Sequence, residues 1–440
     1  MWFISVTGAS VAVEMAASDQ VMQLTTTSRP MRVAILNTHP IQYFAPLYAY
    51  LTTHEPDLDL TVLYCSDYSL RGAVDDGFAR TVKWDIDLLS GYRHIFLGQA
   101  ARTRKPAGFW SLIAPELWRE LRSGRYDVLW LHGYGYFACW LAFLAARTMR
   151  MPVMLRGETH LGLLRAGWRG RVRNRFLRAY FRSIQAFLAI GSRNREYYQA
   201  MGVAADAIHL VPYAVDNTRF IASARLEPDA RAQMRIRLGL RPGVTTVLYA
   251  SRLVERKHPA TLLRAISSLQ RAGIDVGLCV IGSGPLDQSL RQESQELGLR
   301  DISFVGFLNQ QELPRAFSSC EIFVLAAEAE PWGLVVNEVM CAGLPVIVSD
   351  EAGCAADLVE HGVNGLRVTA GDSAQLARAI EKLALDSQLR DSMGRASLER
   401  IRGWGFAECA EGLRSALCSL QRKPESMSAN RSQSIGNPVV

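Results

Sequence analysis

Residues 330–338 read EPWGLVVNE, and the segments on either side of them predict how this part of the chain folds. Residues 321–325, EIFVL, have the apolar run of a buried parallel strand, and residues 336–342 have a helical pattern. Residues 343–345, GLP, end that helix before a second apolar run begins. In open α/β sheets, a loop between the carboxyl end of a strand and a helix N-terminus binds nucleotides. The pattern therefore predicts an α/β fold with Glu330 at the mouth of a ligand site.

The two acidic residues of this segment are too far apart to form a hydrolytic acid/base pair. Pro331 fits the first turn of the helix, where its missing N–H is not needed. If the whole segment is helical, the axial rise puts Glu330 and Glu338 about 12 Å apart. The paired carboxylates of glycosidases lie roughly 5 to 9.5 Å apart. The spacing favours two acidic groups that contact different parts of one elongated ligand.

Apolar strand patterns alternate with helical patterns along the chain, which is typical of parallel, doubly wound sheets. The predicted strands of the first half lie near residues 33–37, 60–64, 94–97, 128–131, 153–155 and 187–190. Those of the second half lie near residues 247–250, 277–281, 303–305, 322–325 and 345–348. We therefore predict an α/β protein of two Rossmann-like domains, residues 31–212 and residues 213–405.

The two ends of the chain lack this alternation. Residues 1–30 predict a flexible extension, because the regular strand pattern begins only at Met31. Either Met1 or Met31 can be the start of the protein. Residues 421–440 are rich in Ser, Asn, Gln and Pro and predict a disordered tail.

The composition indicates a globular protein of a reducing compartment, such as the cytoplasm. Hydrophobic residues make up 49% of the 440 residues and charged residues 21%, which is ordinary for a globular chain. No apolar run approaches the about 20 residues that a membrane-spanning helix needs. The N-terminus has no basic region of the kind that begins a signal peptide. The eight cysteines include no CxxC pair, which argues against both a disulfide framework and a metal site.

One segment is strongly basic. Residues 159–195 contain no acidic residue, and four of their arginines fall on one helical stripe: Arg171, Arg175, Arg178 and Arg182. The apolar residues of this segment occupy much of the opposite side: Val172, Phe176, Leu177, Tyr180, Phe181 and Ile184. Such a helix can lie on an anionic membrane or meet an anionic lipid-linked acceptor. The alternative is a core-packed helix with a solvated basic face. Nucleic acid fits less well, because no recognised binding module accompanies the arginines.

Four further segments, together with residues 330–338, carry a family resemblance. They read ASRLVERK at 250–257, VIGSGPL at 280–286, FVGF at 304–307 and MCAGLPV at 340–346. The combination resembles the retaining glycosyltransferases of family four, also called glycosyl transferases group 1. The similarity runs from about Arg32 to about Leu420. It implies the GT-B fold, in which two Rossmann-like domains face each other across a cleft, and it implies that a last helix, residues 406–420, returns to the N-terminal domain.

The resemblance assigns donor-binding roles to residues of the C-terminal half. Arg252 and Lys257 correspond to the cations that neutralise the departing diphosphate, a task that suits a planar guanidinium and a mobile ammonium. Glu338 corresponds to the residue that binds the ribose hydroxyls, and Glu330 to the one that contacts a hydroxyl of the donor sugar. The remaining donor-side candidates are the backbone N–H groups of Trp332, Gly333 and Leu334 and the turn glycines Gly282 and Gly284. The two glycines can equally serve only a tight turn.

The N-terminal half matches the family less closely. His132 ends a predicted strand and corresponds to a histidine that faces the donor sugar from the opposite domain. The loops at residues 37–43 and 155–160 depart from the family pattern, and both are expected to line the acceptor side. Their candidates for acceptor binding are His39, Arg156 and Glu158. The two Asp-x-Asp triplets, at residues 57–59 and 85–87, are placed unfavourably for a metal site, so no metal is expected.

These observations predict a retaining glycosyltransferase that moves a sugar from a nucleotide-sugar to a glycan or lipid-linked acceptor. The resemblance and the basic helix favour cell-surface polysaccharide, lipopolysaccharide or exopolysaccharide assembly on the inner face of the cytoplasmic membrane. No cofactor is expected besides the nucleotide-sugar, which is a substrate. Two alternatives remain: another GT-B enzyme, such as a sugar-nucleotide epimerase or a phosphorylase, and a non-catalytic nucleotide- or lipid-binding protein of the membrane surface.

Overall fold

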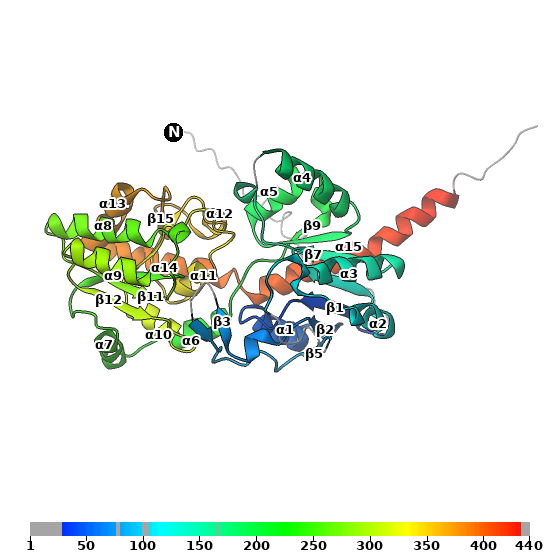
Figure 1. Ribbon diagram of the computed structural model, residues 1–440, viewed down its shortest axis with the longest axis horizontal. Helices are drawn as coiled ribbons and strands as arrows, with labels where there is room; N and C mark the ends of the chain where they lie inside the picture. The colour runs from blue at the N-terminus through cyan, green and yellow to red at the C-terminus, as the bar shows by residue number, and fades with distance from the viewer. Residues whose placement is uncertain (1–28, 76–79, 99–104, 165–166, 433–440) are drawn as a thin grey trace, which may run out of the picture.

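The computed structural model describes residues 29–75, 80–98, 105–164 and 167–432, and within it two lobes are each built around one parallel sheet (Figure 1). The N-terminal sheet has the strand order β5-β2-β1-β6-β7-β8-β9. Its strands are β1 (Met31–Asn37), β2 (Leu58–Tyr64), β5 (Arg93–Phe96), β6 (Val128–His132), β7 (Val153–Arg156), β8 (Ala186–Ala189) and β9 (Ile208–Leu210). Every neighbouring pair in this sheet is parallel.

The C-terminal sheet repeats this plan with the order β12-β11-β10-β13-β14-β15. Its strands are β10 (Thr245–Ala250), β11 (Val276–Ile281), β12 (Ile302–Gly306), β13 (Ile322–Leu325), β14 (Val346–Ser349) and β15 (Gly365–Val368). All of its pairs are parallel as well. The predicted fold class, two doubly wound domains, is confirmed. The sequence analysis did not anticipate β15 or the antiparallel hairpin of β3 (Ala73–Asp75) and β4 (Arg80–Val82).

Helices cover both faces of each sheet, which explains why the strands are continuous apolar runs. The N-terminal lobe contains α1 (Phe44–His54), α2 (Glu116–Ser123), α3 (Phe137–Thr148), α4 (Gly167–Phe181) and α5 (Ser192–Ala200). The C-terminal lobe contains α6 (Asn217–Ala224), α7 (Pro228–Arg237), α8 (Pro259–Arg271), α9 (Asp287–Glu296), α10 (Leu313–Phe317), α11 (Leu334–Cys341), α12 (Ala355–Leu358), α13 (Ser373–Leu385) and α14 (Ser387–Arg402). Several starts are set locally: Asp216, Asp372 and Asp386 each accept a backbone N–H at the start of α6, α13 and α14.

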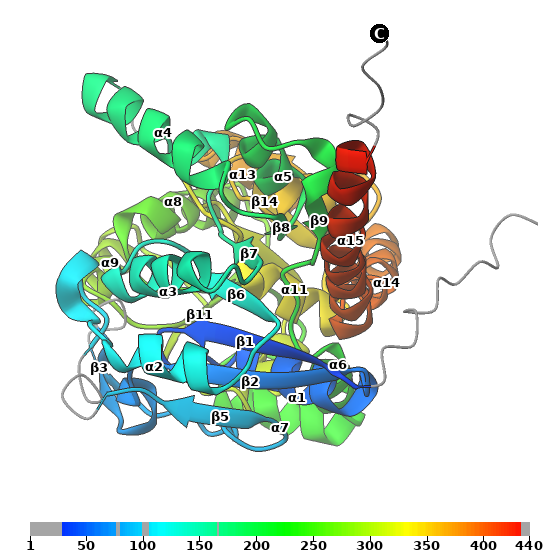
Figure 2. The same ribbon diagram turned by 90° about the vertical axis from the view of Figure 1, so that its right-hand side faces the viewer.

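The last helix, α15 (Phe406–Ser432), returns to the N-terminal lobe and lies along β8 and β9 (Figure 2). Arg414 pairs with Glu55, and the Cys409 thiol donates to the carbonyl oxygen of Pro212. Helix α15 thus packs on the N-terminal lobe. The helix continues to Ser432, whereas the sequence predicted that it ends near Leu420 and that a disordered tail follows. The predicted extension at residues 1–28 and the end of the tail at residues 433–440 lie outside the described residues.

Tyr213 fastens the two lobes together where the chain passes between them. Its carbonyl oxygen accepts the Asn337 Nδ2–H group at 2.9 Å and the Trp404 Nε1–H group at 3.2 Å. The Trp332 indole stacks on Trp404 with ring centroids 5.8 Å apart and donates to Asn337 Oδ1. One hydrophobic cluster accordingly continues from the N-terminal sheet into the C-terminal sheet. These contacts join the two lobes on this side of the cleft.

The helices were compared with the length of a membrane span, and the cysteines with the requirements of a disulfide. No helix among the described residues is both long and apolar enough to cross a membrane. All eight cysteines are free thiols, and all but Cys418 are buried. Buried thiols of this kind pack as small hydrophobic groups.

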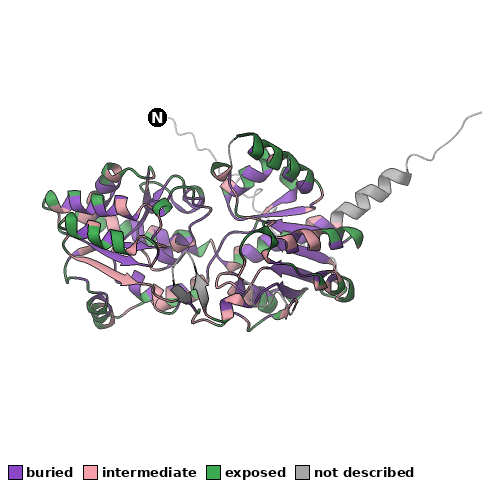
Figure 3. Ribbon diagram, in the orientation of Figure 1, coloured by how far each residue is buried: buried purple, intermediate pink, exposed green. Residues whose placement is uncertain are grey.

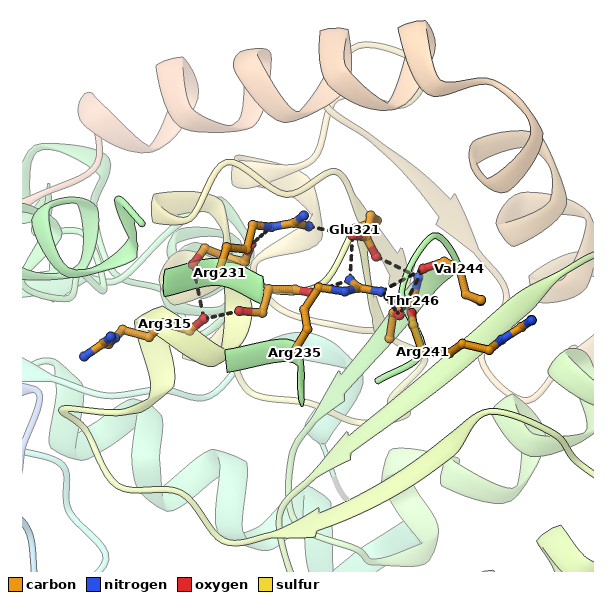
Figure 4. A network of polar contacts seen from close by, with 9 residues as sticks. Arg231, Arg235, Arg241, Val244, Thr246, Arg315 and Glu321 are labelled. Atoms are coloured by element: carbon orange, nitrogen blue, oxygen red, sulfur yellow. Dashed lines mark hydrogen bonds and ion pairs between the residues drawn. The ribbon is translucent and has the colours of Figure 1, made fainter. Parts of the chain in front are cut away.

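A buried arginine ties helix α7 to the edge of the C-terminal sheet (Figure 4). Arg235 donates to Glu321 Oε1 at 2.8 Å and to four further oxygen atoms. These belong to the backbone of Ser319, Arg241 and Val244 and to the side chain of Thr246. Glu321 also accepts the Thr246 N–H group. Because the guanidinium donates to several carbonyl groups inside the protein, its removal leaves them without this donor. Glu321 would keep its ion pair with Arg231.

We predict that Arg235→Met destabilises the protein by about 2–3 kcal/mol, because buried carbonyl groups lose their hydrogen-bond donor. Urea unfolding followed by circular dichroism measures the change. Arg237→Met, on the same helix, is the matched control, because Arg237 is exposed and forms a surface ion pair with Glu312. It should cost no more than about 1 kcal/mol. Equal effects of the two substitutions would contradict the structural role of Arg235.

Candidate active site

A cavity of about 430 Å³ lies between the two sheets. Residues from both lobes line it. The N-terminal lobe and the linker contribute Gln42, Tyr43, Trp84, Glu158 and Tyr213. The C-terminal lobe contributes, among others, Arg252, Arg256, Lys257, Gly282, Phe307, Leu308, Gln310, Glu330, Trp332, Gly333, Leu334 and Glu338. The cavity therefore joins an apolar end, near Phe307, to a strongly charged end, near Lys257.

The C-terminal lining comes from loops that follow neighbouring parallel strands. Arg252 comes just after β10, Gly282 after β11 and Phe307 after β12. Glu330 and the start of α11 come after β13. The carboxyl ends of parallel strands share one edge of the sheet, so residues far apart in the sequence converge there.

Glu330 holds two cations at the charged end of the cavity. The Lys257 ammonium group is hydrogen-bonded to Glu330 Oε2, and Arg256 Nη1 lies 3.0 Å from the same oxygen atom. Lys257 and Glu330 are both buried. Burial lowers the pKa of Lys257, and the adjacent Glu330 carboxylate opposes that effect. Arg256 is exposed, and its guanidinium also reaches the cavity, although the sequence analysis assigned it no role.

Helix α11 points its N-terminus at the cavity. The helix begins at Leu334, so Pro331 lies in the preceding loop and not in the first helical turn, as the sequence had predicted. Gly333 caps the helix with φ of 98°, a left-handed conformation that suits glycine. A Cβ atom at Gly333 would also lie only 2.9 Å from Leu325 Cδ2. The positive end of the helix dipole is thus presented to a ligand, as at many anion sites.

Glu338 is a buried carboxylate with an unpaired oxygen atom. It is 2% exposed, and Oε1 has no hydrogen-bond partner among the described residues. Burial raises the pKa of Glu338 to about 7, against the opposing effect of Arg219 and of hydrogen bonds from Gln310 and Tyr43. A buried acceptor without a partner is costly unless a ligand satisfies it. Glu338 is therefore ready to accept a ligand hydroxyl group.

The turn glycines Gly282 and Gly284 differ in whether they line the cavity. Gly282 lines the cavity with φ of 136°, and a Cβ atom there would fall 2.0 Å from the Ser251 carbonyl oxygen. Gly284 is not among the cavity-lining residues, and a Cβ atom there would fall 2.5 Å from the Leu253 carbonyl oxygen. The close approach of two backbone segments accounts for both glycines, while only Gly282 faces the cavity.

The N-terminal candidates are only partly brought to the cavity. Glu158 lines it and accepts the Tyr213 hydroxyl at 2.9 Å. Arg156 is buried beside it and donates to the carbonyl oxygens of Val211 and Pro212, where it supports the linker. Its guanidinium also lies 5.3 Å from the centre of the Tyr213 ring. Arg156 thus has a structural task, while Glu158 faces the ligand space.

The two histidine candidates do not line the described cavity. His132, at the end of β6, is half-buried and its Nε2 atom lies 2.9 Å from the Tyr48 hydroxyl. Burial is the main cause that holds the pKa of His132 well below its ordinary value, so the ring is neutral. His39 Nδ1 lies 2.9 Å from Thr38 Oγ1 in the loop after β1.

A third histidine, His160, holds the loop of Glu330 across the cleft. Gly162 donates its N–H group to His160 Nδ1, so Nε2 carries the proton and donates to the Glu330 carbonyl oxygen at 3.1 Å. The sequence analysis quoted His160 but gave it no role. Nothing in its local pattern signals this contact, because its partner lies in the other domain.

Metal ligation finds no support in the described residues, among which no group of three or more His, Cys, Asp or Glu side chains could hold an ion. In the second Asp-x-Asp triplet, Asp85 accepts the Gln311 N–H group and Asp87 accepts hydrogen bonds from Leu89 and Ser90. The absence of a metal requirement stays a prediction.

The two facing doubly wound domains, with a charged cavity at their strand ends, define a protein of the GT-B fold. The family model for glycosyl transferases group 1 matches residues 230–400, and the glycosyl transferase 4-like domain model matches residues 49–214. The chain belongs to this family of glycosyltransferases.

Curated relatives and solved structures agree with that membership. The chain is 33% identical over 228 residues to the GDP-mannose-dependent alpha-(1-6)-phosphatidylinositol monomannoside mannosyltransferase of Mycobacterium tuberculosis, which is 50% of this chain and 57% of that protein. It is 28% identical over 228 residues to the D-inositol 3-phosphate glycosyltransferase of Nocardia farcinica, 50% of this chain and 49% of that protein. The chain thus spans about half the length of these relatives.

Among solved structures, Anabaena HepE in complex with UDP and glucose is similar with a TM-score of 0.67 and 19% identity, over 88% of this chain and 100% of that one. A glycosyltransferase from Rickettsia africae gives a TM-score of 0.69 at 14% identity, over 89% of this chain and 99% of that one. At these identities the likeness concerns the fold.

We predict that Glu338 makes the ligand-free protein less stable as the pH rises. Its folded pKa of about 7 lies above the ordinary carboxyl value of about 4.3, so burial favours the protonated form. The stability that this group contributes is complete below the ordinary value and is lost as the pH rises through 7. The loss between pH 5 and pH 8 should be on the order of 3 kcal/mol.

Urea unfolding at several pH values tests this prediction. In Glu338→Gln the side chain cannot ionise, so this part of the decline should disappear. Glu411→Gln, at an exposed site on α15, is the matched control and should keep the decline of the unchanged protein. An identical decline in Glu338→Gln would show that Glu338 does not titrate in this range.

Proposed function

We propose that this protein is a retaining, metal-independent hexosyltransferase that moves a sugar from a nucleoside-diphosphate sugar to an acceptor hydroxyl. One observation carries the proposal: a single cavity contains a pair of cations, Arg256 and Lys257, and a buried carboxylate, Glu338, with an unpaired oxygen atom. A diphosphate needs the cations, and a ribose hydroxyl needs the carboxylate. A nucleoside diphosphate carries both groups in one elongated molecule.

In the proposed donor complex, the diphosphate lies against Arg252, Lys257 and the N-terminus of α11. Arg256 adds a third cation. Glu330 now holds Arg256 and Lys257 where the phosphate oxygens would lie, so it exchanges these partners for a hydroxyl of the donor sugar. Glu338 accepts the ribose hydroxyls, and the base lies at the apolar end near Phe307. HepE of Anabaena, which has the same fold, was solved with UDP-glucose, and that supports a nucleotide-sugar donor.

The proposed transfer takes place on one face of the sugar. The bond between the anomeric carbon and the leaving phosphate oxygen breaks as the acceptor oxygen bonds to that carbon from the same side. The leaving phosphate takes the proton of the acceptor hydroxyl, so no protein base is needed and the configuration is retained. Fixed cations that meet the growing charge on the phosphate contribute most to such a reaction, because they need no rearrangement.

The acceptor is proposed to enter from the N-terminal lobe, where Glu158 faces the cavity. A glycan or a lipid-linked glycan of cell-surface polysaccharide, lipopolysaccharide or exopolysaccharide assembly fits this proposal. The mycobacterial relative is described as acting on a phosphatidylinositol mannoside, which supports a lipid-borne acceptor. His132 and His39 are not among the residues that line this cavity.

The surface around α4 supports attachment to an anionic membrane. Val172 and Phe176, on the apolar side of this helix, are 60% and 59% exposed, and Trp168 is 65% exposed. These three residues are four apart and form one stripe along α4, which projects from the body of the protein (Figures 2 and 3). Phe176 contacts Trp140 of α3, which extends the apolar surface beyond the helix.

Arginines border this apolar stripe, as expected for a helix that lies in the headgroup region. By helical geometry Arg171, Arg175, Arg178 and Arg182 lie on one side of it and Arg169 and Arg173 on the other. Five other exposed apolar residues belong to neighbouring elements of the same lobe: Phe109, Trp110, Ile113, Leu144 and Leu161. A solvated helix needs no such stripe, so we favour the inner face of the cytoplasmic membrane as the site of action.

The two alternatives predict different outcomes. A sugar-nucleotide epimerase or a phosphorylase would form product without an acceptor alcohol. A non-catalytic protein of the membrane surface would bind nucleotide or lipid without turnover. The intact set of Arg252, Lys257, Glu330 and Glu338 favours an enzyme.

We predict that one family among UDP-, GDP-, ADP- and dTDP-sugars raises the midpoint of thermal unfolding. A ligand at 100 times its dissociation constant stabilises a protein by about 2.7 kcal/mol. Glu338→Ala should abolish the shift, because the ribose contact is lost. If no nucleotide-sugar moves the midpoint, the transferase proposal fails and the lipid-binding alternative gains support.

With the donor known, Lys257→Ala should lower kcat by about 10²- to 10³-fold, as expected when one group that stabilises the leaving charge is removed. The change is measured as sugar transfer to a mixture of acceptors, and the released nucleoside diphosphate reports the rate. Lys382→Ala, at an exposed site on α13, is the matched control and should keep full activity. Near-normal transfer by Lys257→Ala would contradict the phosphate assignment.

We predict that the protein floats with vesicles that contain phosphatidylglycerol and not with vesicles of phosphatidylcholine alone. Replacing Trp168, Val172 and Phe176 together with Ser should abolish flotation. Replacing Arg171 and Arg175 with Gln should weaken it roughly fivefold per arginine, since each contributes about 1 kcal/mol. Ile236→Ser, at an exposed apolar site on α7, is the control. Flotation of the triple variant at the original level would contradict the assigned surface.

A further inference from the structure

A short segment of the N-terminal lobe is hydrogen-bonded to the C-terminal lobe at the apolar end of the cavity. Asn309 Nδ2 donates to the Lys83 carbonyl oxygen at 2.7 Å. The Gln311 backbone N–H group donates to Asp85 Oδ2 at 3.2 Å, and its side-chain amide donates to the Asp85 carbonyl oxygen. Residues 83–85 and 309–311 therefore form a clasp between the lobes.

Trp84 lies in the middle of this clasp and faces the ligand space. It is one of the cavity-lining residues, and it is only half-buried. Its ring centroid lies 6.3 Å from that of Phe307 at an angle of 54°. Leu308, Leu313 and Phe317 complete this end of the cavity. A planar, uncharged group that entered here would meet aromatic rings from both lobes.

The clasp itself does not need the indole ring. Its hydrogen bonds use the backbone of Lys83 and the backbone and side chain of Asp85, so any residue at position 84 leaves them intact. A large aromatic side chain that lines a cavity and takes no part in the hydrogen bonds beside it points to contact with a ligand. Lys83 and Asp85 thus hold the lobes together, while the Trp84 side chain lines the cavity.

We propose that Trp84 is the outer wall of the nucleobase subsite and stacks on the base of the donor. The inference rests on the proposed function, because it takes the ligand to be a nucleoside diphosphate with its charge at Lys257 and its base at Phe307. Stacking is tolerant of base identity, since every base has a π face. Because the other wall belongs to the C-terminal lobe, the base bridges the two lobes and holds the clasp closed. Trp84 is thus a binding residue that links recognition of the base to closure of the cleft.

Isothermal titration calorimetry with UDP, GDP, ADP, dTDP and inorganic pyrophosphate tests this proposal on the full chain. For the nucleotide that binds best, Trp84→Ala should weaken the affinity by about 5- to 150-fold, the range of one base–aromatic stack. Trp84→Phe should restore most of the affinity, and pyrophosphate should bind all three proteins equally. Asn309→Ala removes one bond of the clasp and leaves the indole, so its effect should be smaller than that of Trp84→Ala.

Each other outcome overturns the proposal. Unchanged nucleotide affinity in Trp84→Ala excludes stacking. Equal weakening of nucleotide and pyrophosphate, or an equal effect of Asn309→Ala, shows that Trp84 acts through closure of the lobes alone. If the unchanged protein binds pyrophosphate but no nucleoside diphosphate, the proposed function fails together with the subsite, whereas the first two results overturn the subsite and leave the function standing.

Discussion

The position of Tyr213 between the two sheets is the constraint on which the cleft depends. Its carbonyl oxygen accepts hydrogen bonds from Asn337 and Trp404 of the C-terminal lobe, and its hydroxyl group donates to Glu158 of the N-terminal lobe. Arg156 secures the two preceding residues through their carbonyl groups. Because these contacts are buried and directional, they fix the approach of the lobes on one side of the cavity, and the cavity has its shape only because they form.

Within that cleft, the balance of buried charge determines what the cavity can bind. Glu330 offsets the charges of Lys257 and Arg256 while no donor is bound, which reduces the cost of burying an ammonium group. At Glu338 the opposite holds, because burial outweighs the favourable effect of Arg219 and raises the carboxyl pKa to about 7. One end of the cavity is thus prepared for an anion and the middle for a hydroxyl group. A nucleoside diphosphate carries both a diphosphate anion and ribose hydroxyl groups, so it matches the whole cavity.

Several contacts show why part of the site was predictable and part was not. Arg252, Lys257, Gly282, Glu330 and Glu338 follow strand ends of one sheet, so the strand pattern and the family resemblance place them together. The role of Arg256 was missed because its partner Glu330 follows a different strand, and an exposed arginine carries no local sign of that contact. The amphipathic pattern of α4 left membrane contact and core packing open, because it does not tell how much of an apolar stripe the neighbouring elements cover. Val172 and Phe176 are exposed, whereas Leu177 is buried. Helix α15 likewise extends beyond its predicted end.

The sequence by itself determined the two parallel sheets, because continuous apolar runs between helical segments can only be buried on both faces. It also determined the return of the last helix and, through its motifs, the family. Only the tertiary structure decided which groups meet across the cleft: Trp84 with Phe307, His160 with the Glu330 carbonyl, and Tyr213 with Asn337. Sequence periodicity reports which face of a strand or helix is buried, and that information is local. The contacts across the cleft depend on how two separately folded sheets are placed against each other, which no local pattern encodes.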